Sequence, residues 1–109
     1  MINTQLIGYL GQDCQVNNIN GKTVINFSVA HSESWTDSTG VKKEKSIWVA
    51  CSWWADNTKI AQYLKKSSQV YVEGLPEAKT YQNKAGETIP QLHLRVKMLQ
   101  LLGSKKEEI

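Results

Sequence analysis

The chain has 109 residues, 40% of them hydrophobic, and its 13 basic and 10 acidic side chains give a formal charge of +3 at pH 7. This length allows one domain, expected over residues 1–103, with a short charged end at 104–109. The composition excludes a membrane-spanning protein, because no apolar run is long enough to cross a bilayer, and the charge is too small to hold a nucleic acid by itself. Since the start resembles neither a secretory nor a transit signal, we expect a cytoplasmic protein.

Two strands are predicted in the first third of the chain. Period-two alternation of apolar residues predicts a strand over residues 4–16, in which Gly8 and Gly11 permit a bulge or a sharp bend. The dipeptide Asn20-Gly21 favours a type I′ turn, which joins this strand to a second one over residues 22–34 as a hairpin. The face of the second strand expected to be buried holds Thr23, Ile25, Phe27 and Val29.

A polar loop over residues 36–45 and a third strand over residues 46–54 follow. Successive side chains of a strand point to opposite faces, so parity divides the third strand into two sets. The set expected inside consists of Ile47, Val49, Cys51 and Trp53. Trp48 and Trp54 then emerge together on the outer face.

The rest of the chain predicts one helix and two strands. Asp56 is a suitable helix cap, and an apolar stripe of about two turns follows it at Ile60, Ala61 and Leu64. A fourth strand begins at residues 69–75, bends at Gly74-Leu75-Pro76, resumes at residues 79–82 and ends in a turn at 83–86. In the last strand Leu92, Leu94, Val96 and Met98 point one way, and His93, Arg95 and Lys97 point the other. Five strands with a short helix between the third and the fourth predict an all-β OB-fold, a Greek-key barrel.

Four aromatic residues stand apart from the predicted core. Burial is the more common explanation for a tryptophan, yet Trp48 and Trp54 on one outer face favour a stacking platform. Trp35 and Tyr81 lie in polar segments, where each could also be a loop anchor. The lysines near these segments are Lys42, Lys43, Lys45, Lys79 and Lys84. Aromatics interleaved with lysines are typical of proteins that bind single-stranded nucleic acid without sequence preference.

The cysteines and histidines predict neither a metal site nor an enzyme. Cys14 and Cys51 are far apart in sequence and form no ligand cluster with His31 and His93, so reduced thiols are expected. We interpret both histidines as exposed strand residues. Because the sequence also contains no catalytic triad motif, phosphate-binding glycine loop or outstanding carboxylate pair, we expect a protein with no enzymatic activity and no cofactor.

Three ordered motifs closely resemble the bacterial single-stranded DNA-binding protein family, and the likeness runs from about residue 2 to residue 103. They are Gly8-Tyr9-Leu10-Gly11-Gln12-Asp13, Ser32-Glu33-Ser34-Trp35 and Ser68-Gln69-Val70-Tyr71-Val72-Glu73-Gly74. The resemblance implies an OB-fold homotetramer, built as a dimer of dimers, that binds single-stranded DNA in replication, repair and recombination. It also implies that Trp35, Trp48, Trp54 and Tyr81 occupy the positions of the family's DNA-stacking aromatics.

The chain departs from the family pattern in three places. Val49 stands where a histidine commonly takes part in tetramer contacts, and residues 75–78 replace arginines that usually precede the third aromatic. The usual long tail with an acidic end is replaced by residues 105–109, so recruitment of replication and repair proteins in the usual way is not expected. Two alternatives stay open: a replication-restart accessory protein of related fold that acts through protein contacts, and an RNA-binding OB module.

Overall fold

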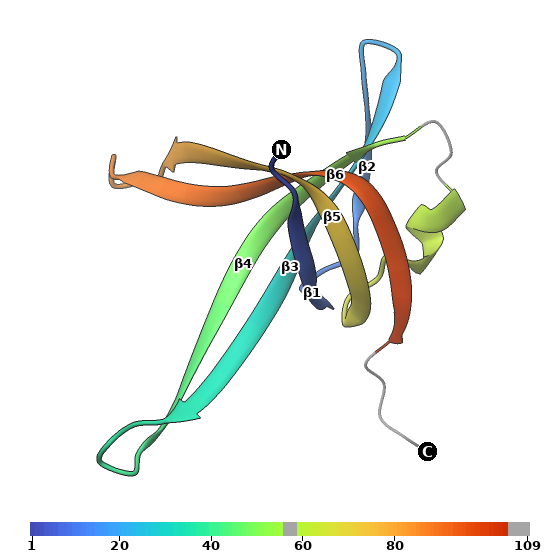
Figure 1. The fold of residues 1–109 in the computed structure, drawn as a ribbon. Coiled ribbons are helices and arrows are strands. Elements are labelled where there is room, and N and C mark those ends of the chain that lie inside the picture. The colour runs from blue at the N-terminus through green and yellow to red at the C-terminus, as the bar shows by residue number, and fades with distance from the viewer. Residues whose placement is uncertain (56–58, 105–109) are drawn as a thin grey trace.

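The computed structural model describes residues 1–55 and 59–104, and within them strands predominate (Figure 1). The elements in chain order are β1 (Thr4–Leu10), β2 (Gln15–Ile19), β3 (Lys22–Thr36), β4 (Lys42–Trp54), the 3₁₀ helix η1 (Lys59–Tyr63), β5 (Ser68–Gln82) and β6 (Thr88–Ser104). The predicted all-β class is confirmed. None of the helices in this part of the chain is long and apolar enough to span a membrane.

Five of the strands close into a ring. The sheet order runs β1-β5-β6-β4-β3, and β3 pairs again with β1 at Tyr9↔Ala30 and Leu10↔Val29. The contact between β4 and β6 is parallel, whereas the other pairs of the ring are antiparallel. Together with η1 between β4 and β5, this ring confirms the predicted five-stranded barrel.

The first predicted strand, residues 4–16, is wrong as a single strand. It divides into β1, which belongs to the ring, and β2, which pairs with β3 outside it. The chain breaks between them because its backbone bonds elsewhere: the Gly11 N–H donates to Ser28 O at 3.2 Å, and the Cys14 N–H donates to Leu64 O at 2.9 Å. Between β2 and β3 the chain turns at Asn20-Gly21, where both residues have positive φ, as predicted.

The predicted loop over residues 36–45 is also wrong. Strand β3 continues to Thr36 and β4 begins at Lys42, so that the connection shrinks to residues 37–41. Cross-strand pairs such as Trp35↔Lys43 and Glu33↔Lys45 extend the ladder into this polar segment. The segment is polar because both of its faces meet water, and not because it lacks regular structure.

Strand β5 runs without interruption through the predicted bend at residues 74–76. The bend takes the form of a register shift, in which Glu73 lies opposite Met98 and Gly74 lies opposite Val96. The shift leaves Lys97 without an opposite residue and reverses the parity of β6. As a result Leu99 packs against the core, and Met98, predicted to point inward, is 43% exposed.

Within the described residues the predicted helix takes the form of the 3₁₀ element η1, and the proposed cap, Asp56, lies outside them. The apolar stripe nevertheless acts as expected: Ile60 and Ala61 pack against the core, and Leu64 is completely buried. Leu64 thus closes one end of the barrel.

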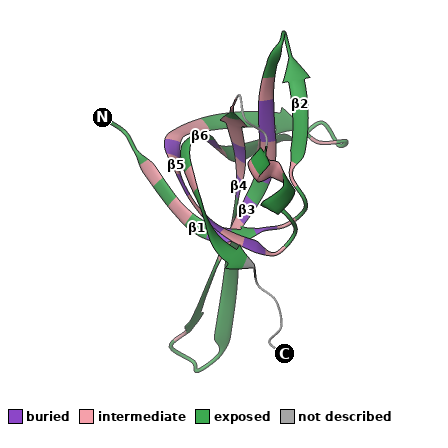
Figure 2. Cartoon of the chain, turned by 90° about the vertical axis from the view of Figure 1, so that its right-hand side faces the viewer, coloured by how far each residue is buried: buried purple, intermediate pink, exposed green. Residues whose placement is uncertain are grey.

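The core lies inside the ring, where burial is concentrated (Figure 2). Its buried members are Leu10, Ile25, Phe27, Val29, Val49, Cys51, Leu64, Val70, Val72, Leu94 and Val96. Three hairpins extend away from it: β2–β3, β3–β4 and β5–β6 (Figure 1). We call the outer parts of the last two the β3–β4 arm, residues 32–46, and the β5–β6 arm, residues 77–92. Leu92, predicted to point inward, is 47% exposed because it lies on the β5–β6 arm, beyond the barrel.

Candidate nucleic-acid interface

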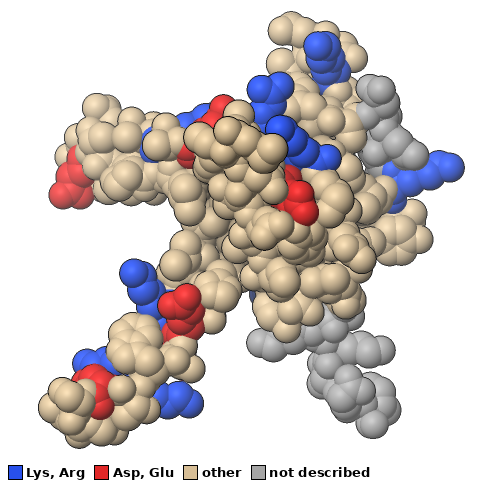
Figure 3. All heavy atoms as spheres, in the orientation of Figure 1, with Lys and Arg blue, Asp and Glu red and all other residues tan. Residues whose placement is uncertain are grey.

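The two arms and the barrel between them surround a wide hollow (Figure 3). The β3–β4 arm forms one side and the β5–β6 arm forms the other, and strand β4 runs from the barrel into the first arm. Lysine side chains, with acidic side chains beside them, border the hollow on the β3–β4 arm (Figure 3). A long flexible polymer could enter this hollow from its open side without any rearrangement of the barrel.

The four aromatic side chains singled out from the sequence are exposed. Their exposed fractions are 46% for Trp35, 54% for Trp48, 43% for Trp54 and 51% for Tyr81. Trp53, by contrast, is partly buried and packs against the core, as its parity predicted. Exposed tryptophans are costly in water unless another molecule covers them, so each of these positions marks a surface where a ligand or a second chain can bind.

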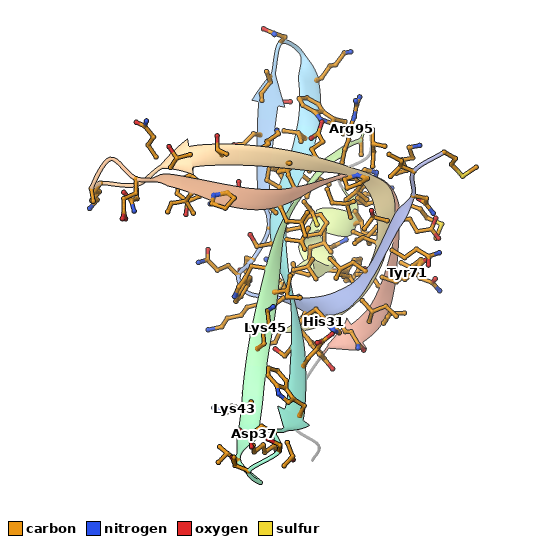
Figure 4. The ribbon with its side chains drawn as sticks, turned by 60° about the vertical axis from the view of Figure 1, so that its left-hand side comes forward. His31, Asp37, Lys43, Lys45, Tyr71 and Arg95 are labelled. Atoms are coloured by element: carbon orange, nitrogen blue, oxygen red, sulfur yellow. The ribbon has the colours of Figure 1, made fainter. Side chains whose placement is uncertain are left out.

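The lysines lie on strands or turns beside these aromatics. Lys42, Lys43 and Lys45 belong to β4, and Lys43 pairs across the ladder with Trp35. The Lys43 Nζ lies 3.9 Å from Asp37 Oδ2 at the tip of the arm (Figure 4). On the other arm, Lys79 Nζ lies 3.8 Å from Glu77 Oε1, and Lys84 belongs to the turn at the tip.

Trp48 lines a groove on the outer face of the barrel, next to the connection between β1 and β2. Small and polar side chains of β3 and β4 form its floor. The floor residues are Asn26, Ser28, Ala50 and Ser52. A flat ring placed on Trp48 would therefore meet hydrogen-bonding groups at its edge.

Trp54 belongs to a second groove that is more basic than the first. Its lining includes Lys79 and two basic residues that the sequence analysis did not select, Lys22 and Arg95. Arg95 was assigned to the outward face of β6, but its place beside Trp54 depends on the parallel pairing Ser52↔Arg95. Such a long-range pairing leaves no local signal in the sequence. Lys22 reaches the groove because β3 and β4 pair at Val24↔Trp54.

A chain of polar side chains connects the two grooves. The Ser52 hydroxyl donates to Asn26 Oδ1 at 2.8 Å and lies 3.2 Å from His93 Nε2, while His93 Nδ1 lies 3.2 Å from Glu77 Oε1. The predicted exposure of His93 is wrong, because only 13% of its side chain is accessible. The strand pairing places it between Ser52 and Glu77 and so covers it.

This Ser-His-Glu connection resembles a catalytic triad only in its order. The Ser52 hydroxyl hydrogen is directed to Asn26, so the imidazole is not placed to remove it. Ser52 also lies within β4, paired with both β3 and β6, and not on the sharp turn that exposes a nucleophile. The polar chain holds four strands together beneath the two grooves.

The two cysteines are free thiols. Cys51 is buried, and burial raises the pKa of its thiol to about 12. Burial also raises the pKa of the Cys14 thiol, whose Sγ lies 3.4 Å from Ala61 O. Within residues 1–55 and 59–104, no three histidine, cysteine, aspartate or glutamate side chains gather in a way that could hold a metal ion.

Comparison with known sequences gives a consistent result. The sequence model of the Single-strand binding protein family matches residues 1–102. A single-stranded DNA-binding protein of Neisseria meningitidis is 38% identical over 104 residues, which make up 94% of this chain and 60% of that protein. Single-stranded DNA-binding protein 1 of Chlorobaculum tepidum is 36% identical over 103 residues, 92% of this chain and 64% of that protein. The chain therefore spans about three fifths of the length of these relatives.

Solved structures share the fold. The SSB of Plasmodium falciparum, in a complex with single-stranded DNA, superimposes with a TM-score of 0.77 and 24% identity, covering 94% of this chain and 95% of that one. A small single-stranded DNA-binding protein of Streptomyces coelicolor gives a TM-score of 0.73 at 12% identity, covering 92% and 93%. At such low identities the likeness establishes the barrel architecture.

Proposed function

Because this chain belongs to the single-strand binding protein family, we propose that it binds single-stranded DNA without sequence preference and protects it during replication, repair and recombination. The observation that carries the proposal is the set of four exposed aromatics, two on β4 and one on each arm, with basic side chains beside them. The relatives that match nearly the whole chain bear the name single-stranded DNA-binding protein.

The chemistry of the surface suits a strand whose bases are unpaired. Every base has a π face, and stacking one on an aromatic side chain contributes roughly 1–3 kcal/mol whatever the base. We assign this stacking to Trp35, Trp48, Trp54 and Tyr81. The phosphates between stacked bases need cations, and we assign this role to Lys42, Lys43, Lys45, Lys79 and Lys84, joined by Lys22 and Arg95. Lack of sequence preference follows, since neither interaction depends on the identity of the base.

The same proposal includes how the protein works with other molecules. We infer a homotetramer, built as a dimer of dimers, that acts in the cytoplasm at the nucleoid and needs no cofactor and no catalysis. Light scattering at micromolar concentration tests the tetramer, and a monomeric mass would contradict it.

Titration with oligo-dT tests the central claim. Stacked bases should strongly quench tryptophan fluorescence, and the logarithm of the affinity should fall by about 0.7 per neutralised phosphate for each tenfold increase in salt. Duplex DNA should compete weakly. Unchanged fluorescence at saturating oligonucleotide would remove the stacking proposal, and stronger competition by single-stranded RNA than by oligo-dT would favour an RNA-binding module.

A further inference from the structure

The indole ring of Trp48 lies directly against the backbone of Gly11. A methyl group at Gly11 would lie 2.5 Å from Cζ3 and 2.6 Å from Cη2 of Trp48, far inside van der Waals contact. The next nearest atom, Cε3 at 3.8 Å, also belongs to Trp48. The space that a side chain at this position would need is therefore occupied by the benzene ring of the indole.

We propose that Gly11 is a positioning residue for DNA binding: its missing side chain lets the Trp48 ring rest on the connection between β1 and β2, which sets the tilt of the ring toward the groove. The proposal rests on the proposed function, in which Trp48 stacks on a base. It assigns a role in DNA binding to a residue that has no side chain to contact DNA.

The backbone of Gly11 is well placed to serve as a support. Its N–H donates to Ser28 O at 3.2 Å, which attaches the support to β3. Trp48 extends from β4, and β3 and β4 pair directly at Ser28↔Ala50 and Ala30↔Trp48. Ring and support are thus fixed to neighbouring strands. A tryptophan that is 54% exposed would otherwise be free to change rotamer, and an ordered ring loses less entropy when a base stacks on it.

Two comparisons show that this glycine is not needed for the fold itself. The φ angle of Gly11 is not in the left-handed region, so an alanine could adopt the same backbone conformation. At Gly8, by contrast, a methyl group would collide with the carbonyl oxygen of Ala30, which is part of the barrel. Gly8→Ala should therefore destabilise the barrel, whereas Gly11→Ala should displace an exposed ring.

The test uses the full chain and six variants: Gly11→Ala, Trp48→Phe, Trp48→Ala, Trp54→Ala, and Gly11→Ala combined either with Trp48→Phe or with Trp54→Ala. Gly11→Ala should weaken oligo-dT binding roughly three- to tenfold, a part of what complete loss of one stacking aromatic removes. Phenylalanine lacks the far edge of the indole, so adding Gly11→Ala to Trp48→Phe should change the affinity less than twofold. In the Trp54→Ala background, Gly11→Ala should still cost its full factor, because Gly11 lies against Trp48 and does not line the groove of Trp54.

A measurement without DNA separates this inference from the proposed function. The indole N–H resonance of Trp48, identified by its loss in Trp48→Phe, should shift in Gly11→Ala while the thermal midpoint stays close to that of the unaltered protein. If Trp48→Ala leaves oligo-dT binding unchanged, the stacking role of Trp48 is wrong, whatever the resonance shows. If Trp48→Ala weakens binding and Gly11→Ala does not, the positioning role is overturned. A large fall in the thermal midpoint of both Gly11→Ala and the Gly11→Ala/Trp48→Phe double variant would also overturn it, because the methyl group would then collide with the barrel and not with the ring.

Discussion

The tips of the two arms form the same five-residue turn, but chemically different side chains hold it. Asp37 begins one turn and Asn83 begins the other, and in each the side-chain oxygen accepts from the N–H groups two and four residues later at 2.9–3.0 Å. In each, the fourth residue is a glycine with positive φ, 86° at Gly40 and 83° at Gly86. A carboxylate and an amide thus support the same backbone.

The chemistry separates the arms where the geometry does not. Asp37 is charged, accepts a further hydrogen bond from the Thr39 hydroxyl at 2.7 Å, and lies beside Lys43. Asn83 is neutral and donates through its amide to Glu87 Oε1 at 2.9 Å. The two turns thus share their backbone form, while the oxygen that holds the turn is charged, and can titrate, only in the β3–β4 arm. Substitutions on each arm test how far this difference between the tips extends to the strands behind them.

The largest effect is expected from the aromatic side chain that each arm presents. Trp35→Ala should weaken oligo-dT binding by roughly 2–3 kcal/mol and Tyr81→Ala by roughly 1–2 kcal/mol, because the indole has the larger stacking surface. Fluorescence titration or anisotropy with labelled oligo-dT measures both. A greater loss from Tyr81→Ala would reverse the ranking of the arms.

Two controls keep this result interpretable. Trp35→Phe and Tyr81→Phe retain a ring and should keep most of the affinity, whereas a purely polar role of the tyrosine hydroxyl would make Tyr81→Phe as weak as Tyr81→Ala. Val41→Ala changes an apolar side chain of the β3–β4 arm that is 50% exposed, and it should leave binding unaltered. If Val41→Ala weakens binding as much as Trp35→Ala, exposed apolar area and not stacking holds the strand.

The barrel could be predicted well from the sequence, because the patterns that indicate its strands and turns are local. Parity alone separated Trp53 from Trp48 and Trp54, and turn chemistry placed the bend at Asn20-Gly21. Where the prediction was wrong, tertiary pairing decided. The polar segment over residues 36–45 was predicted to be a loop. Thr36 and residues 42–45 instead continue β3 and β4, which pair with each other beyond the core.

The candidate interface was predicted only in part, and for the same reason. The exposed aromatics could be found one strand at a time, although their role in DNA binding stays a prediction. Arg95 comes beside Trp54 through a parallel pairing of β4 with β6, and His93 becomes covered through the same pairing. No local pattern encodes a contact between residues more than forty positions apart.

A smaller effect is expected from the carboxylate at the base of the β5–β6 arm. Glu77 Oε1 lies 3.2 Å from His93 Nδ1 and 3.8 Å from Lys79 Nζ, so it places a negative charge in the basic groove of Trp54. Glu77→Gln removes that charge and should raise the affinity for oligo-dT roughly two- to fivefold at low salt. The gain should disappear as salt increases, because screening removes the repulsion.

Asp37→Asn provides the matched change on the other arm. It also removes one negative charge, but from the tip and not from a groove, so its gain in affinity should be smaller than that of Glu77→Gln. Weaker binding by Glu77→Gln would show that the carboxylate contributes more by holding His93 in place than it loses by repelling phosphate.

The smallest effect expected is the loosening of one arm tip at acid pH. The Thr39 hydroxyl, followed by the backbone N–H of Val41, lowers the pKa of the Asp37 carboxyl in the folded protein. A lowered folded pKa means that this group contributes stability above its unfolded pKa of about 3.9 and loses it as the pH falls through the lower folded value. Acid should therefore loosen the tip of the β3–β4 arm and leave the tip of the β5–β6 arm intact.

Amide chemical shifts and hydrogen exchange between about pH 5 and pH 2 measure this difference at Thr39 and Val41 against Ala85 and Glu87. Asp37→Asn should abolish the acid response of the first tip. Asn83→Asp, made together with Glu87→Gln so that two carboxylates do not face each other, should create one in the second, because the oxygen that accepts from the backbone N–H groups of residues 85 and 87 would then titrate. If the acid response appears in whichever turn holds the carboxylate, the two turns support the backbone equally well. The arms then differ through the residues on their strands. If Asn83→Asp gives no response, the Thr39 hydroxyl and Lys43 are required as well, and the similarity of the tips ends at the backbone.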